Sequence, residues 1–240
     1  MSKAYKNKAC VYCLKRQSID GDHVIARQFF LAEQRDKLPK VPACKDCNNE
    51  KSQLEHYLTT VLPFGGTHAS SSTMLSTLVP NRLKRNLKLY NALIAGAVIN
   101  PNRGRQKSST IPFDGSSLTR LYELIARGLA WHHWRLLINE DYVVRAGFFI
   151  NEGVPFFQRL LAMNATNRVF GNFGNGVFQY EGVQAIECPQ LTVWRMSFYG
   201  VEVGGHSQGP QYRSSQAFCI SASIHSTIIR DLPHLFWGQQ

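Results

Sequence analysis

Apolar positions recur at helical spacing in the first part of the chain. Residues 49–58 carry such a pattern, with Asn48 or Asn49 available as the N-cap. Residues 81–99 and 118–137 show the same periodicity, and the second of these has the most regular apolar stripe. We therefore expect three helices in these segments.

Later segments are rich in β-branched and aromatic residues and are broken by Gly, Asn and Pro, which is typical of strands. They are residues 142–150, 168–173, 183–188, 191–199 and 217–225. We expect a mainly antiparallel sheet that carries the helix at 118–137. Its aromatic residues, among them Trp194, Phe198 and Tyr199, are expected to form core and not a platform for stacked bases.

Composition indicates a folded protein of the α+β class. Of 240 residues, 44% are hydrophobic and 18% are charged, which suffices for a substantial core. We expect three parts: an N-terminal module at 1–65, a basic linker and helix region at 66–115, and a C-terminal α+β domain at 116–240. The first residues are polar and no apolar run is long enough to cross a bilayer, so we expect a cytoplasmic protein with no membrane partner.

The net charge of +11 is unevenly distributed. Residues 1–60 hold eleven Lys and Arg against seven Asp and Glu, residues 61–110 hold seven against none, and residues 111–240 hold nine against nine. All of the positive excess therefore lies in the first 110 residues. A basic surface can serve solubility alone, but beside a metal site it favours a polyanionic partner such as nucleic acid.

Four of the six cysteines form two CxxC pairs, Cys10–Cys13 and Cys44–Cys47. This spacing is typical of a tetrahedral zinc site, and it favours a structural Zn²⁺ over disulfides or redox chemistry. The remaining two, Cys188 and Cys219, are expected to be buried, inert thiols.

Thirty residues separate the two pairs, and they contain Asp22 and His23 side by side. His23 can act as a general base toward water, while Asp22 and an Asn carbonyl offer the oxygen ligands that Mg²⁺ or Mn²⁺ prefers. Soft thiolates would keep Zn²⁺ in the separate cysteine site. These residue types indicate hydrolysis of a phosphodiester by a nuclease with two metals in separate roles.

The order CxxC, Asp-His, CxxC-Asn resembles the HNH endonucleases, whose core is a ββα-metal element. The matching residues are Cys10, Cys13, Asp22, His23, Cys44, Cys47 and Asn48, and the similarity covers roughly residues 8–60. The resemblance implies that His23 is the general base, that Asp22 and Asn48 hold the catalytic cation, and that cleavage leaves a 5′ phosphate and a 3′ hydroxyl. It also suggests a role in defence against foreign DNA.

The chain departs from that family in one respect. No Asn occurs between His23 and Cys44, where the family carries an Asn that orients the catalytic His, so another residue or a carbonyl must do so. Asn49 is an alternative to Asn48 as ligand. Glu50, Glu55 and His56 on the same helix are further alternatives.

Double-stranded DNA is the expected substrate, with loops at 63–73 and 101–110 neutralising phosphates. The basic residues expected to contact nucleic acid are Lys51, Arg82, Lys84, Arg85, Arg103, Arg105 and Lys107. The C-terminal domain is expected to set target choice or to contact a regulatory protein or a second copy of the chain. The alternative function is a non-catalytic zinc-finger module that binds nucleic acid or protein. A zinc deaminase is excluded, because the position two residues after His23 is Ile25 and not Glu.

Two adjacent histidines, His132 and His133, lie within the helix expected at 118–137. Adjacent helical residues point about 100° apart and cannot chelate one ion together. We expect His132 to be a packed core residue and make no assignment for His133. Arg127 and Arg135 are expected to be surface charges of the same helix.

Overall fold

A computed structural model describes residues 3–100, 108–148, 153–204 and 213–235. Its centre is a five-stranded, fully antiparallel sheet with the strand order β5-β11-β8-β7-β6. The strands are β5 (Tyr142–Gly147), β6 (Arg168–Phe173), β7 (Phe178–Gln184), β8 (Thr192–Phe198) and β11 (Ala217–Ser223). The mixed helix and strand content and the mainly antiparallel sheet expected from the sequence are confirmed.

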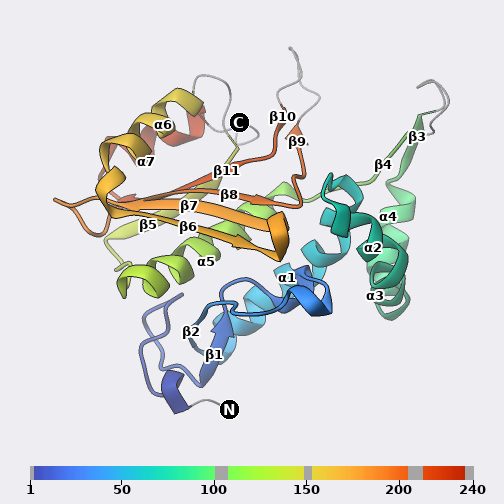
Figure 1. Ribbon diagram of the computed structural model, residues 1–240, viewed down its shortest axis with the longest axis horizontal. Coiled ribbons are helices and arrows are strands. Elements are labelled where there is room, and N and C mark those ends of the chain that lie inside the picture. The colour runs from blue at the N-terminus through green and yellow to red at the C-terminus, as the bar shows by residue number, and fades with distance from the viewer. Residues whose placement is uncertain (1–2, 101–107, 149–152, 205–212, 236–240) are drawn as a thin grey trace.

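Helices cover both faces of this sheet (Figure 1). Helix α5 (Gly115–Trp134) packs on one face, and α6 (Gly153–Met163) and α7 (Thr227–Leu235) pack on the other. Side chains of strand β8 point to alternate faces: Trp194 and Met196 point toward α5, whereas Val193, just before them, joins the cluster under α6 and α7. Trp194, Phe198 and Tyr199 are buried, so the expectation that these aromatics form core is confirmed.

The N-terminal part forms a hairpin followed by a long helix on the far side of α5 (Figure 1). Its elements are η1 (Lys3–Tyr5), β1 (Asp20–His23), η2 (Arg27–Phe29), η3 (Ala32–Gln34), β2 (Lys40–Ala43) and α1 (Lys45–Gly65). One continuous hydrophobic cluster runs from this element through α5 into the sheet, and it includes Val24, Leu58, Leu129 and Trp194. The N-terminal element is therefore packed against the rest of the chain through a shared core.

Helix α1 is longer than expected and begins earlier. Cys44 is its N-cap and Lys45 its first residue, so Asn48 and Asn49 lie inside the helix and are not its cap. The second CxxC pair thus occupies the helix start. The pattern of apolar positions did not show this, because the first residues of the helix, 45–48, are mostly polar and exposed.

Segment 63–73, expected to be a loop that contacts phosphates, is mostly helical. Helix α1 extends to Gly65, and α2 (Ala69–Thr77) follows after three residues. His68 caps α2, because its Nδ1 accepts a hydrogen bond of 3.1 Å from the Ser70 N–H. Serine-rich composition therefore marks a capped helix here, and the prediction of a loop at 63–73 is wrong.

Short elements fill the remaining described segments. They are α3 (Val79–Arg85), α4 (Leu87–Ala95), β3 (Val98–Asn100), β4 (Ser108–Thr110), β9 (Val203–Gly204), β10 (Arg213–Ser214), η4 (Ala165–Asn167) and η5 (Gly174–Gly176). The single helix expected at 81–99 is divided at Asn86, whose side chain caps α4 by accepting from the Leu89 N–H at 3.0 Å. No helix in the described part of the chain is long and apolar enough to cross a membrane.

Candidate metal centre and adjoining hairpin

The four cysteines of the two CxxC pairs converge at one point. The sulfurs of Cys10, Cys13, Cys44 and Cys47 all lie within 4.8 Å of one another, and the Cys13 and Cys44 sulfurs are 3.8 Å apart. Zinc–sulfur bonds of about 2.3 Å in a tetrahedron separate the sulfurs by about 3.8 Å. The cluster can therefore hold a metal ion such as zinc, and the donor set and its spacing fit the expected ion.

The local backbone prepares some of these sulfurs for ligation. Burial would raise the pKa of Cys13, but the N–H groups of Arg16 and Lys15 bond to its sulfur and lower the pKa to about 7. Burial instead raises the pKa of Cys10. A metal ion would displace protons from the remaining thiols as it binds.

The hairpin presents Asp22 and His23 beside this centre. Strands β1 and β2 are antiparallel, with Asp22 opposite Val41 and His23 opposite Lys40. Asp22 is largely buried, and its Oδ2 accepts a hydrogen bond of 2.6 Å from the Tyr12 hydroxyl. Tyr12 lies between the cysteines of the first pair, so this hydrogen bond links the Cys10–Cys13 turn directly to the hairpin.

Beneath the hairpin, Lys51 of α1 is completely buried between two carboxylates. Its Nζ lies 3.0 Å from Oδ2 of Asp22, pairs with Oε1 of Glu55, and donates to the carbonyl of His23 at 2.7 Å. Burial alone would lower the pKa of Lys51, but Asp22 and Glu55 raise it, so the ammonium stays charged. Its three N–H donors therefore have three acceptors.

Lys51 corrects an expectation from the sequence. It was expected to contact nucleic acid, but its side chain is 0% exposed and is fully engaged inside the protein. Neither its contact with Asp22 nor the contact of Tyr12 with Asp22 was foreseen. The i,i+4 spacing of Lys51 and Glu55 on one helix was the available signal, although such pairs usually lie at the surface.

His23 is half-buried at the end of β1. Burial lowers its pKa, and the neighbouring charges of Lys40 and Arg27 lower it further, while Asp22 acts in the opposite direction. The imidazole is therefore neutral at pH 7, and a neutral imidazole is the form that can accept a proton.

Asn48 and Asn49 are the fourth and fifth residues of α1, and both side chains are exposed. Of the alternative ligands on this helix, Glu50 is paired with Arg120 of α5, Glu55 is paired with Lys51, and His56 is exposed. The two glutamates are thus engaged elsewhere, which leaves the asparagines as the available oxygen donors.

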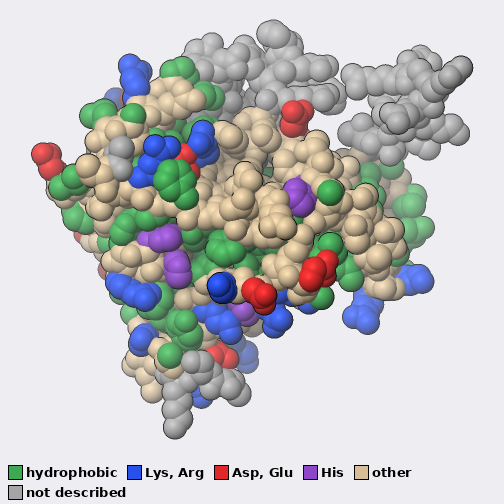
Figure 2. Space-filling model, in the orientation of Figure 1, with side chains coloured by type: hydrophobic (Ala, Val, Ile, Leu, Met, Phe, Trp, Pro, Cys, Tyr) green, Lys and Arg blue, Asp and Glu red, His purple; other side chains and the backbone are tan. Residues whose placement is uncertain are grey.

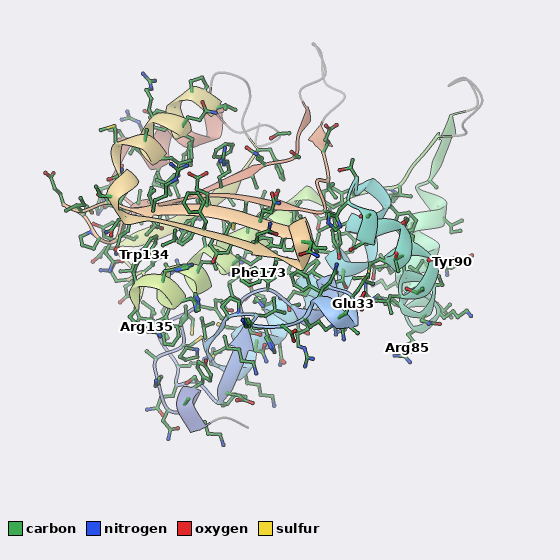
Figure 3. All side chains as sticks on the ribbon, in the orientation of Figure 1. Glu33, Arg85, Tyr90, Trp134, Arg135 and Phe173 are labelled. Carbon is green, nitrogen blue, oxygen red and sulfur yellow. The ribbon has the colours of Figure 1, made fainter. Side chains whose placement is uncertain are left out.

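The remaining expected nucleic-acid contacts differ in their surroundings. Arg82 is partly buried, and it donates to the carbonyl oxygens of Thr59 and Gln28, so it ties α3 to α1 and η2. Lys84 and Arg85 are exposed on α3, and Figure 3 shows Arg85 at the end of that helix. Arg103, Arg105 and Lys107, with most of the loop expected at 101–110, lie outside the described residues.

Lys and Arg side chains gather over the N-terminal element and near α3 on the face shown in Figure 2. Among the N-terminal residues, Lys6, Lys8, Lys15, Arg27 and Lys37 are exposed. Part of the positive excess of the sequence is therefore displayed on the surface around the hairpin.

The expectation that His132 is a packed core residue is wrong. His132 is exposed, and the unassigned His133 is the packed one, with a hydrogen bond of 2.8 Å to the Tyr180 hydroxyl and a ring contact with Trp194. The buried face of α5 continues from Leu129 by four residues to His133, and not by three to His132.

Two further groups of side chains have mixed outcomes. Arg127 is not a free surface charge, because it donates to the Ile138 carbonyl at 3.0 Å, whereas Arg135 is exposed as expected. Cys219 is buried as expected, but Cys188 is only partly buried and lies 3.3 Å from the Tyr142 hydroxyl.

Comparison with known proteins adds no relative: no family model, no curated protein and no solved structure matches this chain.

Proposed function

We propose that the protein is a metal-dependent endonuclease that hydrolyses phosphodiester bonds, with double-stranded DNA as the favoured substrate. The observation that carries the proposal is the position of His23, half-buried and neutral at the end of β1, in a hairpin joined to helix α1 by a tetracysteine cluster. The order strand, strand, helix in β1, β2 and α1 supports the proposal, because the ββα-metal element that the sequence resembles has the same order.

In this proposal each residue has a distinct task. His23 accepts the proton of the attacking water, and exposed Asn48 offers an amide oxygen to a divalent cation. A bound Mg²⁺ or Mn²⁺ would supply charge neutralisation at the phosphate and the leaving oxygen. The cysteine cluster, with zinc as the proposed ion, holds the turn that carries Cys10 and Cys13 against the start of α1.

Asp22 has little capacity left to bind a cation. Its Oδ2 already accepts from Tyr12 and faces Lys51, so only Oδ1 remains for a cation. That engagement favours the second candidate function, a non-catalytic zinc module that binds nucleic acid through its basic surface. In such a module Asp22 would be a structural residue that locks the hairpin to α1.

Substitution of the two adjacent asparagines distinguishes the two functions and identifies which asparagine binds the catalytic cation. Both are exposed, so replacing either with Ala removes one amide at equal structural cost. An endonuclease that uses Asn48 loses Mg²⁺-dependent DNA cleavage in Asn48→Ala and keeps it in Asn49→Ala. The reverse result would assign the ligand to Asn49, and a purified protein that binds DNA but shows no cleavage before or after substitution is the binding module.

A further inference from the structure

A basic pocket lies between the N-terminal segment and the C-terminal end of α5. Its volume is about 540 Å³, within the range of small-ligand sites. Its cationic side chains are Lys8, Lys37, Lys40 and Arg135, accompanied by His132 and by the rings of Tyr5 and Trp131. The N-terminal segment and the end of α5, about 90 residues further along the chain, therefore build one site.

Among the described residues, the cations of this pocket have no acidic counterpart. None of the described carboxylates lines the pocket or forms an ion pair with Lys8, Lys37, Lys40 or Arg135. Four like charges that converge on one concavity repel one another and raise the local positive potential. A polyanion would relieve that repulsion, which a neutral ligand would not.

Contacts with Trp131 hold the guanidinium group of Arg135 in place. Its guanidinium lies 4.3 Å from the centre of the Trp131 ring, and its Nη1 makes one long contact of 3.4 Å to the Trp131 carbonyl. Most of its N–H donors therefore remain available in the fixed fork that matches a phosphate. Figure 3 shows Arg135 at the end of α5, above the N-terminal segment.

Two of the basic residues adopt a backbone conformation that normally favours glycine. Arg135 has φ 55° and Lys37 has φ 56°, although neither is Gly or Asn. A helix that ends in this conformation would be more stable with Gly at the position of Arg135. The charged side chains are therefore kept at a conformational cost, which fits a binding role better than a purely structural one.

The pocket also adjoins the candidate nuclease site. Lys40, which lines it, is the direct cross-strand partner of His23 in the hairpin. A strand whose scissile phosphate lies at His23 would have its neighbouring phosphates within reach of the pocket.

We propose that this pocket binds the phosphate backbone of the nucleic-acid strand on one side of the cleaved bond, and that α5 contributes Arg135 to this contact. The inference rests on the proposed endonuclease function, because that function supplies the strand. It gives part of the C-terminal region a role in holding the substrate.

Binding of a short labelled DNA duplex tests the proposal without cleavage. The His23→Ala protein is used without added Mg²⁺ or Mn²⁺, and Lys37→Gln/Arg135→Gln is compared with Arg145→Gln/Arg159→Gln. The control pair removes the same charge from two exposed residues outside the pocket, one of them on α6 across the sheet. We expect the pocket variant to weaken binding about tenfold per lost contact and to reduce the salt slope by about two.

Arg135→Gly separates binding from folding. Gly relieves the left-handed backbone, so we expect the melting temperature to hold or rise while duplex binding weakens. Equal weakening in the pocket and control variants, or no duplex binding by the parent protein, would overturn the inference. Cleavage by the protein with intact His23 is measured separately. Cleavage together with unchanged binding in the pocket variant would contradict only the pocket inference, whereas weakened binding in that variant without any cleavage would contradict only the endonuclease proposal.

Discussion

The Nζ of Lys51 lies 2.7 Å from the carbonyl oxygen of His23, so a buried ammonium on α1 is bonded to the backbone of the proposed general base. The same group contacts Asp22 and Glu55. The family that the sequence resembles uses an additional Asn to orient its catalytic His, and this chain has none at that place. Lys51 fixes the backbone from which the His23 side chain extends and is thus a positioning residue in our account.

Replacing Lys51 with Met should destabilise the protein by about 3–5 kcal/mol, because it leaves the buried carboxylates of Asp22 and Glu55 without their partner. Urea unfolding followed by circular dichroism measures the change. The variant Lys51→Met/Glu55→Met should be less destabilised than the sum of its single changes. As a control, Arg230→Met removes an exposed pair with Asp231 and should cost at most about 1 kcal/mol. Equal effects of the two lysine and arginine changes would contradict the buried network.

The cysteine cluster predicts that the purified protein carries one tightly held metal ion, with zinc as the expected element. Cys44→Ser should lose this ion and several kcal/mol of stability, because Cys44 belongs both to the cluster and to the hydrophobic core. Elemental analysis and thermal unfolding report the two effects. Cys188→Ser, which changes a cysteine far from the cluster in sequence, should keep the metal, and a metal-free native protein would refute the site.

Gly182 of β7 should not tolerate a side chain. A Cβ added there would come within 2.2 Å of the Trp194 ring, which is buried in the core. Gly182→Ala should therefore cost about 1–3 kcal/mol through forced repacking. Gly115→Ala is the matched control, because nothing lies within 4 Å of its added Cβ at the start of α5, and it should be neutral or slightly stabilising. Chemical denaturation of both variants measures the change. A neutral Gly182→Ala would contradict the pairing of Gly182 with Trp194 between β7 and β8.

His133 should make stability depend on pH below neutrality. Burial, with a smaller contribution from His132, lowers the pKa of His133 to about 4, whereas an unfolded histidine titrates near 6.5. The unfolded chain therefore binds the proton more tightly, and the stabilising contribution is complete above about pH 6.5 and lost as pH falls toward 4. His133→Gln should flatten the melting-temperature profile across this interval, while replacing exposed His225 in the same way should not. A profile unchanged by His133→Gln would argue against its packed position.

The antiparallel sheet and α5 were predictable because their signals are local and repeated. Residues 168–173 alternate as a strand does, and the structure places β6 over that range. Helix α6 was not predicted because it carries Gly and Pro near its start, and α7 was not predicted because it is short and contains Pro233, which is unfavourable inside a helix. The strand expected at 183–188 lies earlier, at Phe178–Gln184, where Gly182 conceals a buried strand.

For the candidate site, sequence spacing predicted that the four cysteines converge, because short CxxC turns leave little geometric freedom. It could not predict the burial of Lys51, since a lysine near two acids is normally exposed and only the three-dimensional packing of the hairpin on α1 removes it from water. Helical spacing alone could not decide between His132 and His133, because positions three and four residues after buried Leu129 both lie near the apolar stripe of α5.

Cleavage of plasmid DNA tests the central claim most directly. The purified protein is compared with His23→Ala in Mg²⁺, Mn²⁺ or a chelator selective for these ions, with the metal content of the cysteine cluster checked in both proteins. We expect divalent-ion-dependent cleavage that falls about 10²–10⁴-fold in His23→Ala while the cluster metal is retained. Equal cleavage by both proteins, or none by either, would contradict the proposal that His23 is the general base of an endonuclease.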